Sequence, residues 1–276
     1  MSISVLILTL NEEQNLPRCL NSVGWSDDIV ILDSFSTDRT LEIAKAAGAR
    51  VVQRKFDNWA MHQNWALTNI SFKHPWVYYS DADEVVPANF RDEMLAAVRS
   101  ESGVVAYRTR YKNYFMGRWI RHCGIYPVWI LRLFKPDKVR WERQVNPVAV
   151  VDGKEGRLQE HFEHFSFNNG LDAWFAKHNR YSWQEAEESL KSLGKGGFTF
   201  GGLWSHEPAT RRRALKELSF RLPFRPLLRF LYMYIIRLGF LDGLPGYYYC
   251  RLLAIYEFMI VIKMREIRRR QQGLPI

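Results

Sequence analysis

Cysteine is scarce in this sequence, and its spacing excludes two classes of protein. The 276 residues include three cysteines, Cys19, Cys123 and Cys250, and no two of them form a CxxC pair. A small secreted domain held by disulfides and a cysteine-rich zinc site both need closely spaced pairs. We therefore expect three reduced thiols in a protein that faces the cytosol.

Long apolar runs are also missing. No charge-free segment reaches the roughly 18 apolar residues that a membrane-spanning helix needs, and LLAIYEFMIVI (252–262) is interrupted by Glu257. The apolar opening at 3–10 lacks a basic flank, so we expect no signal peptide. The Gly-Lys in GKGGFTFGG (194–202) is not followed by Ser or Thr, which excludes a P-loop and indicates a flexible linker.

Positive charge is concentrated in the C-terminal quarter. The chain carries +10 overall, but residues 205–276 hold fourteen Lys or Arg and five Asp or Glu, which leaves +1 for residues 1–204. The same quarter is rich in Leu, Ile, Tyr and Phe. Basic and apolar residues together favour an anionic membrane surface as a partner and argue against nucleic acid.

Short apolar runs alternate with helical patterns over the first hundred residues. The patterns predict strands at 3–10, 28–33, 49–54 and 76–81, and helices at 12–23, 36–48, 58–70 and 87–100. Ser36 or Thr37 is the expected N-cap of the second helix, and Gly48 its C-cap. This alternation predicts an α/β fold, with a mostly parallel sheet covered by helices on both faces.

The pattern changes after residue 103. Strand character is expected at 103–115, 128–136, 145–153 and 157–167, with a long loop at 116–127 and a helix at 171–193. In the tail, regularly spaced arginines between apolar clusters predict amphipathic helices that lie in a membrane interface, or alternatively a packed helical subdomain. The predicted domains are therefore a catalytic domain at 1–193, a Gly-rich linker at 194–204 and a basic amphipathic helical region at 205–276.

Polar clusters follow the predicted strands at their carboxyl ends. TLNEE follows the first strand, DSFSTD the second, and Asp81, Asp83 and Glu84 the fourth. Parallel sheets place ligands at this edge. Carboxylates two residues apart can hold a hard divalent cation that leaves positions open for phosphate oxygens, and such a cation would neutralise a departing diphosphate.

The order of these motifs resembles that of family 2 glycosyltransferases with the GT-A (Rossmann-like) fold. The resemblance lies in VLILTLNEEQNLPRCLNSV, DIVILDSFSTDRTLEIAKAAGARVV, HQNWAL and YYSDADEVV. HNRYSWQEA and RFLYMYIIRLGFLDGLPG resemble a narrower subgroup that adds a sugar, often glucose, to the lipopolysaccharide core or to related membrane-attached glycans. The resemblance implies an inverting, metal-dependent transferase that moves a hexose from a UDP-sugar to such an acceptor.

The resemblance also implies roles for the residues at matching positions. The nucleotide-sugar would be bound by Thr9, Asn11, Glu12, Asp33, Asp38, Gln63, Asn64, Asp81 and Arg180. Mg²⁺ or Mn²⁺ would be held by Asp81, Asp83 and His164. His164 is alternatively a packed edge-strand histidine, and Arg180, expected at the diphosphate, is alternatively an exposed helix residue.

The general base departs from the subgroup's pattern. Members commonly show His-Glu or Asn-Glu near position 146, whereas here Asn146 is followed by Pro147, which cannot accept a proton. Glu142 is the expected base, with Glu84 and Glu163 as alternatives.

Two other acceptor and activity hypotheses stay open. A polyprenyl-phosphate sugar synthase needs no strong base, and the basic stretch YRTRYK (107–112) could serve its acceptor phosphate. A degenerate, non-enzymatic membrane scaffold is the third hypothesis. The expected location is the cytoplasmic face of the inner membrane, with peripheral or monotopic attachment.

Two pairs of residues are expected to be structural. His122 and Cys123 have no partner at metal-ligand spacing, which favours a packed loop. Trp59 and Trp65 are expected to pack in the core.

Overall fold

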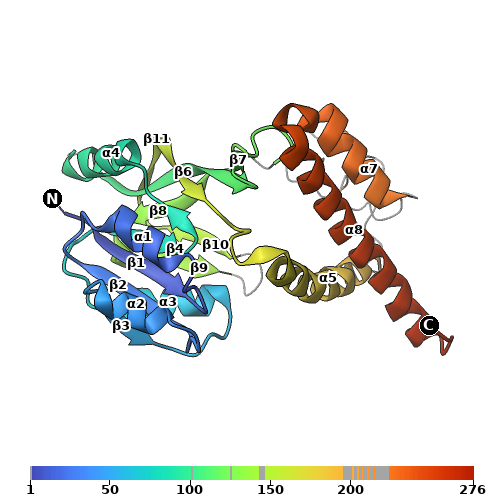
Figure 1. The fold of residues 1–276 in the computed structure, drawn as a ribbon, viewed down its shortest axis with the longest axis horizontal. Helices are drawn as coiled ribbons and strands as arrows, with labels where there is room; N and C mark the ends of the chain where they lie inside the picture. Colours follow the sequence, from blue (N-terminus) through green and yellow to red (C-terminus); the bar gives the residue numbers. More distant parts are fainter. Residues whose placement is uncertain are drawn as a thin grey trace. The chain divides into compact units, whose positions relative to one another are not determined.

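The computed structural model describes residues 2–100, 102–124, 126–142, 147–194 and 224–276, with residues 201, 204, 207, 210, 211 and 214. The chain divides into two compact units (Figure 1). The first, here the sheet unit, comprises Met1–Trp119 and Ile125–Asn169. The second, the helical unit, comprises Ile120–Gly124 and Gly170–Ile276.

A nine-stranded sheet forms the centre of the sheet unit. Its order is β3-β2-β1-β4-β8-β6-β11-β5, with β7 on β6. The pairings of β3, β2, β1 and β4 are parallel, and β6 and β11 run in the same direction as these four. Strands β8 and β5 run against them. The predicted mostly parallel sheet is therefore present, with reversed strands in its second half.

The element bounds of the sheet unit follow the sequence pattern closely. The strands are β1 (Ser4–Thr9), β2 (Ile29–Asp33), β3 (Arg50–Gln53), β4 (Val77–Asp81), β5 (Glu84–Val85), β6 (Val104–Phe115), β7 (Arg118–Trp119), β8 (Ile130–Phe134), β9 (Val139–Glu142), β10 (Val148–Val151) and β11 (Lys154–His164). The helices are α1 (Leu16–Val23), α2 (Thr40–Ala46), α3 (Trp59–Asn69), α4 (Ala88–Arg99) and the short η1 (Pro136–Lys138).

Helices cover both faces of the sheet because its central strands are apolar on both sides. All six residues of β1 are buried. One core cluster joins β1, β2 and β4 to α1, α2 and α4, and includes Leu16, Phe90 and Met94. The opposite cluster joins the same strands to α3 and to the separate β9–β10 hairpin, through Ala66 and Trp141. Burying each large apolar side chain stabilises the fold by roughly 1.5–3 kcal/mol.

Several local predictions need correction. Neither Ser36 nor Thr37 caps α2, because its N-cap is Arg39 and Ser36 instead donates to Asp33. The expected long loop at 116–127 contains β7, and the two-residue β5 was not anticipated. Trp59 is 40% exposed rather than buried, whereas Trp65 packs on the second cluster as expected.

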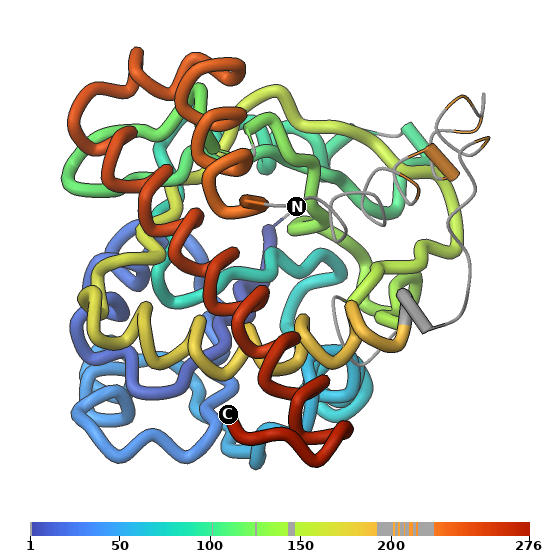
Figure 2. Tube along the Cα trace, turned by 90° about the vertical axis from the view of Figure 1, so that its right-hand side faces the viewer, coloured from blue at the N-terminus to red at the C-terminus, as the bar shows by residue number. Residues whose placement is uncertain are grey.

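The helical unit is built around the long helix α8 (Gly243–Gln271), which pairs with α5 (Gly170–Gly194) and with α7 (Arg225–Leu231). Figure 2 shows α5 and α8 crossing. The buried Lys263 Nζ on α8 donates to the Asn179 carbonyl and side-chain oxygens and to the Ser182 hydroxyl on α5. The segment HNRYSWQEA (178–186) therefore supplies the α5 side of the contact between α5 and α8.

A second polar anchor lies between η4 (Gly239–Asp242) and the loop 120–124. The buried Asp242 carboxylate accepts bonds from the His122 amide at 2.9 Å, the His122 ring at 2.7 Å and the Cys123 amide at 3.1 Å. Burial raises the pKa of Asp242, but these donors outweigh burial and lower it. The packed loop expected for His122 and Cys123 is present.

The units divide the chain differently from the predicted domains. The catalytic domain was expected to end at residue 193, but α5 packs on α8 and belongs with the helical unit. Most of the predicted linker at 194–204 lies outside the described residues. The π-helix η3 (Tyr232–Ile236) follows α7. In the described ranges, no helix combines the length and apolar character that crossing a bilayer requires.

Asp28 at the start of β2 is the most heavily bonded carboxylate on the strands' amino edge. It accepts from Ser4 Oγ at 2.5 Å, from the Lys73 amide at 2.7 Å and from Arg50 Nη2 at 2.8 Å. Burial raises the pKa of Asp28, but these donors outweigh burial and lower it below 3.8. The bonds therefore stabilise the fold at neutral pH, and protonation removes that contribution as the pH falls below about 4.

We expect Asp28→Asn to lower the free energy of unfolding at pH 7 by about 1–3 kcal/mol, because it leaves charged and backbone donors poorly paired. The gap between variant and wild type should narrow at pH 3, where the wild-type carboxyl begins to protonate. Urea unfolding at both pH values measures this. Asp137→Asn, at a carboxylate that is 73% exposed, is the control. An equal gap at the two pH values would contradict the assignment.

Candidate active site

The acids of DADE are separated by a tight turn between β4 and β5. Strand β5 pairs with β11, which places His164 opposite Glu84. The Phe165 amide donates to the Asp83 carbonyl at 2.9 Å. The same pairing brings His164 Nε2 within 3.3 Å of Asp83 Oδ2. Asp83 and His164, 81 residues apart in the sequence, thus lie together as the sequence predicted.

The other two acids are held by a buried arginine from the neighbouring strand. Arg132 Nη2 on β8 donates to Asp81 Oδ2 at 2.7 Å and also to Glu84 Oε1. Arg132 is 8% exposed and Glu84 is 2% exposed. The guanidinium lies over the rings of Tyr79 and Phe162, at 4.7 and 5.4 Å. Its geometry fixes the direction of the Asp81 carboxylate.

Burial and neighbouring charges shift the pKa values of three groups in and beside this cluster. Burial raises the pKa of Glu84 to about 8, although Arg132 opposes that rise. Burial lowers the pKa of His164, but Asp83, Glu84 and Asp81 outweigh it and raise the pKa above 6.5. Burial also raises the pKa of the nearby Glu12, and Asp83 and Asp81 add to that rise. The site therefore favours a bound cation.

Arg132 is the residue that sequence reasoning missed. Its signal was a lone charge inside the apolar run VWILRLF (128–134). A strand that buries such a side chain needs a paired carboxylate. The sequence therefore indicates that Arg132 has an acidic partner, but it does not identify that partner.

The predicted nucleotide residues after β1 and β2 bind one another. Asp33 is fully buried and accepts from Thr9 Oγ1 at 3.0 Å, from Ser36 Oγ at 2.5 Å and from Gln53 Nε2 at 3.1 Å. These bonds shape the start of the DSFSTD loop. The binding roles predicted for Thr9 and Asp33 stay predictions.

Asn11, Glu12 and Asp38 join the two loops across the sheet edge. Asn11, with φ +56°, accepts from the Thr37 amide at 2.8 Å. Asp38 accepts from the Glu13 amide at 3.1 Å, and the Glu12 amide donates to Thr40. Burial raises the pKa of Asp38, but bonds from the Thr40 hydroxyl, the Thr40 amide and the Glu13 amide outweigh burial and lower it. The two loops form one preorganised rim.

Gln63 and Asn64 on α3 lie behind this rim. Gln63 Nε2 donates to the Tyr79 hydroxyl at 2.9 Å, and that hydroxyl donates to Asp81 Oδ1 at 3.3 Å. Asn64 accepts from the Trp141 amide at 2.7 Å and donates to the Trp141 carbonyl at 2.8 Å. Gln63 is thus linked to Asp81, while the polar atoms of Asn64 bind β9.

The remaining predicted residues lie apart from the cluster's bonds. Glu142 on β9 has 55% side-chain exposure and pairs with Arg140 at 3.0 Å. Glu163 on β11 accepts from the Tyr114 hydroxyl at 3.2 Å. Arg180 is exposed on α5 of the helical unit, beside Tyr181. Their predicted roles stay predictions.

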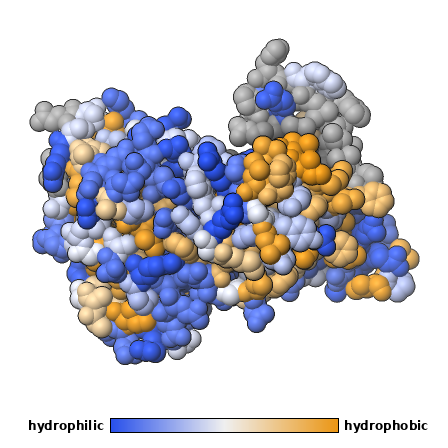
Figure 3. Space-filling view, turned by 45° about the horizontal axis from the view of Figure 1, so that its top comes forward, coloured by the Kyte–Doolittle hydropathy of each residue, from blue (hydrophilic) through white to orange (hydrophobic). Residues whose placement is uncertain are grey.

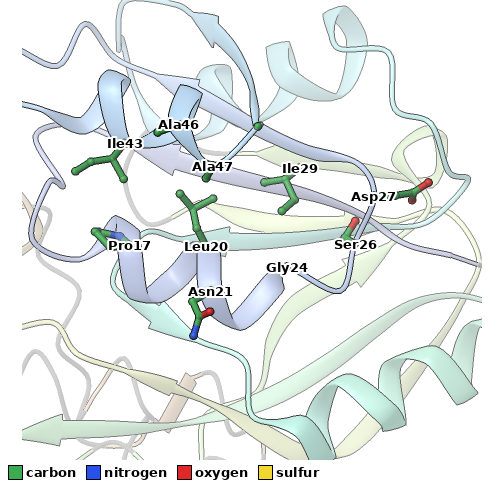
Figure 4. A pocket seen from close by; sticks show the side chains of 11 residues that line it. Pro17, Leu20, Asn21, Gly24, Ser26, Asp27, Ile29, Ile43, Ala46 and Ala47 are labelled. Carbon is green, nitrogen blue, oxygen red and sulfur yellow. The ribbon is translucent and has the colours of Figure 1, made fainter.

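A groove of about 680 Å³ lies elsewhere on the sheet unit. Figure 4 shows it between α1 and α2, with Leu20 and Ile43 facing one another and Ile29 on β2 behind them. None of the predicted site residues lines this groove. It is therefore distinct from the acidic cluster.

The family can now be assigned. The sequence model described as "Glycosyl transferase family 2" matches residues 4–158, more than half of the chain and all of the acidic cluster except His164. The chain belongs to glycosyl transferase family 2. The scaffold hypothesis is thereby set aside, because the transferase belongs to a family of enzymes, and the sheet described above is the one expected for the GT-A fold.

Relatives extend this similarity over nearly the whole transferase. It is 25% identical over 277 residues to "Lipopolysaccharide core biosynthesis glycosyltransferase LpsC" of Rhizobium meliloti, covering 96% of this chain and 93% of that protein. It is 26% identical over 280 residues to an "Uncharacterized glycosyltransferase" of Rickettsia bellii, covering 96% and 86%. Among solved structures, glucosyl-3-phosphoglycerate synthase of Mycobacterium tuberculosis is 26% identical over 40% of this chain and 44% of that one, with a TM-score of 0.35.

The donor set suits a divalent cation only in part. In the ranges that the structure describes, no three His, Cys, Asp or Glu side chains converge on one point. Asp83 and His164 do present a carboxylate oxygen and an imidazole nitrogen side by side, while Asp81 is turned to Arg132. Carboxylate suits Mg²⁺ and Mn²⁺, and imidazole is compatible with transition metals. The pair fits a cation that draws further ligands from substrate.

Removing Arg132 separates its structural effect from its effect on Asp81. Arg132→Met should lower the free energy of unfolding by about 3–5 kcal/mol, because Glu84 is left buried and unpaired. Arg132→Met with Glu84→Gln should recover most of that loss, since no buried charge is then left without a partner. Asp81 still lacks its bond to Arg132 in the double variant. The KM of that variant for the sugar donor should therefore still be about tenfold higher than that of the wild type.

Urea unfolding and steady-state kinetics measure the two quantities. Glu84→Gln alone is the matched control, because Arg132 keeps its bond to Asp81 in that variant. A double variant that regains both wild-type stability and wild-type donor KM would show that Arg132 serves the fold alone.

Proposed function

We propose that this family 2 glycosyltransferase moves a hexose from a UDP-sugar to a membrane-attached saccharide, with inversion at the anomeric carbon. The observation that carries the proposal is the Asp83–His164 pair beside the Arg132-held Asp81. It lies at the carboxyl end of β4, where parallel sheets bind ligands. The preorganised rim of Asn11, Glu12 and Asp38 supplies a neighbouring surface for the nucleotide.

Asp83 and His164 would hold Mg²⁺ or Mn²⁺, with Asp81 as the third predicted ligand. The cation, when bound, neutralises charge on the departing diphosphate. Arg132 holds Asp81 Oδ2, and Gln63 restrains the Tyr79 hydroxyl that donates to Asp81 Oδ1. These contacts limit the motion of the carboxylate before substrate arrives, which is how preorganised charge lowers a barrier.

Glu142 is our proposed general base. Its side chain is exposed, and a base must reach the acceptor hydroxyl. Glu84 cannot do so, since it is enclosed and bonded to Arg132 and Ser80. Glu142→Gln and Glu163→Gln, assayed singly, distinguish the exposed Glu142 from the half-buried Glu163, because the base variant should lose transfer while still hydrolysing the UDP-sugar slowly.

The proposed acceptor is a saccharide of the lipopolysaccharide-core type. Near full-length similarity to a protein named for lipopolysaccharide core biosynthesis supports this class. A polyprenyl phosphate is the second candidate, favoured by the three cations of YRTRYK on β6, of which Arg108 pairs with Glu155. Assaying one UDP-sugar with polyprenyl phosphate and with core oligosaccharide in parallel separates them by the product formed.

The helical unit supplies the proposed attachment to the cytoplasmic face of the inner membrane. Apolar side chains gather on its surface (Figure 3). Phe224, Ile236 and Leu244 are 77%, 70% and 63% exposed, and Arg229 and Arg251 are exposed beside them in sequence. Exposed apolar residues with interspersed arginines suit an anionic headgroup layer, in peripheral or monotopic attachment.

We expect Asp83→Asn to weaken Mn²⁺ binding more than about 100-fold, since even outer-shell changes cost 10–100-fold. Metal-dependent UDP release should fall with it. Electron paramagnetic resonance of free Mn²⁺, in the presence of UDP, measures binding without turnover. His164→Ala should also weaken Mn²⁺ binding. Asp92→Asn on α4 is the control and should leave Mn²⁺ binding unchanged. Full Mn²⁺ affinity in Asp83→Asn would remove this residue from the metal site.

We expect Ile236→Asp with Leu244→Asp to reduce binding to vesicles containing anionic lipid by at least about tenfold, because two apolar side chains lose their burial. Val148→Asp, at a position 45% exposed on β10 of the sheet unit, is the matched control. Vesicle co-sedimentation measures the effect. Binding that is unchanged in the double variant would refute attachment through this surface.

A further inference from the structure

One open face of the sheet unit carries cations packed on indole rings. The Arg110 and Arg157 guanidiniums lie 4.9 and 5.0 Å from the Trp129 ring. Lys112 Nζ lies 4.8 Å from the Trp119 ring, on which His161 stacks. We name the surface formed by these residues the basic–aromatic face: Arg110, Lys112, Trp119, Trp129, Arg157 and His161.

Strand alternation explains why these side chains share a face. Arg110 and Lys112 flank Tyr111 on β6, and Tyr111 points the other way to stack on the core residue Phe162. The β6–β11 register places His161 opposite Arg110. It also places Arg157 opposite Arg108. Like charges directly opposite each other on paired strands destabilise a sheet.

Only part of this positive charge is balanced. Arg108 pairs with Glu155 at 2.5 Å. Within the part of the chain that the structure describes, Arg110, Lys112 and Arg157 form no ion pair with an acid, and Arg110 instead donates to the Gln159 carbonyl. Glu163, opposite Lys112, accepts from Tyr114. An anion at this face would offset the remaining repulsion.

The charges of this face also shift the pKa of His161. Burial lowers its pKa, and the neighbouring charges of Lys112 and Arg110 lower it further, while Glu163 raises it. The face is thus positive enough to disfavour one more proton. Three cations and two indole rings offer both charge and flat apolar surface within one patch.

We propose that the basic–aromatic face binds the anionic saccharide acceptor, with Arg110, Lys112 and Arg157 on its phosphate or carboxylate groups and sugar rings on Trp119 and Trp129. Guanidinium matches phosphate geometry, and indole offers a flat surface to sugar C–H faces. The inference rests on the proposed glycosyl transfer and adds the chemical class of the acceptor.

The strands connect this face to the acidic cluster. Lys112 and Glu163 are paired one step before Asn113 and His164, and His164 contacts Asp83. At about 3.3 Å per residue, Arg110 and His161 lie about 10 Å along the strands from His164. The His164 ring packs against Tyr111 on the opposite face of the sheet, so an oligosaccharide that reaches both must pass around the sheet edge at which the acidic cluster lies. Single-stranded nucleic acid also binds basic and aromatic surfaces, but this position beside the predicted sugar-transfer site favours a saccharide.

The test is direct binding of O-deacylated, phosphorylated lipopolysaccharide core oligosaccharide to the full chain, by calorimetry without donor. We expect Arg110→Gln with Lys112→Gln to raise the Kd about tenfold or more, because two charge-assisted contacts are lost. Arg157→Gln, at an exposed position, should raise the Kd less. This single surface change tests the same face if the double variant misfolds. Lys45→Gln removes one charge from an exposed position on α2, as Arg157→Gln does on β11, and should leave the Kd unchanged.

A dephosphorylated preparation of the same oligosaccharide and a single-stranded oligonucleotide complete the design. The proposal holds if dephosphorylation weakens wild-type binding and abolishes the difference between wild type and double variant. It is overturned if neither preparation binds, if the double variant binds as wild type does, or if the oligonucleotide binds more tightly. Acceptor-free UDP-sugar hydrolysis by the wild type, measured separately, reports on the proposed function, so the two failures are distinguishable.

Discussion

The bridge from Arg132 to Asp81 and Glu84 is the interaction on which the site depends. Three carboxylates within four residues repel one another, and Glu84 is almost fully buried. A buried carboxylate without a partner is strongly destabilising. The guanidinium from β8 relieves that cost and also holds one oxygen of Asp81. Asp83 contacts His164 instead, so the bridge separates the buried Glu84 from the pair that we propose as metal ligands.

The polar side chains at the carboxyl edge of the sheet also form hydrogen bonds within the protein. Asp33 accepts from an amide of its own loop, whereas Asp38 and Asn11 each accept from an amide of the opposite loop. Such bonds cost little at the moment of binding because the loops are already ordered. The residues that are predicted to contact the nucleotide therefore also shape the protein surface on which the nucleotide would lie.

The helical unit divides polar and apolar residues differently. Two of its buried polar groups form internal contacts: Lys263 joins α8 to α5, and Asp242 fixes the loop 120–124. Large apolar residues such as Phe224 and Ile236 are left outside. The described residues of this unit thus leave large apolar side chains exposed, whereas the sheet unit offers charge and hydrogen bonds. Under the proposed function, these two kinds of surface would suit the two ends of a membrane-attached glycan.

Periodicity and turn chemistry in the sequence were enough to determine β1 to β4 and α1 to α4, because each is a local pattern of burial. The Asp83–His164 contact was also predictable, although only through the resemblance to a family. Tertiary structure alone decided which strand lies beside β4, and so which cation meets Asp81 and Glu84. It also decided that α5 packs with α8 and that Arg110, Arg157 and Trp129 share one face. Pairing between distant strands and helices depends on register and packing, which no single segment encodes.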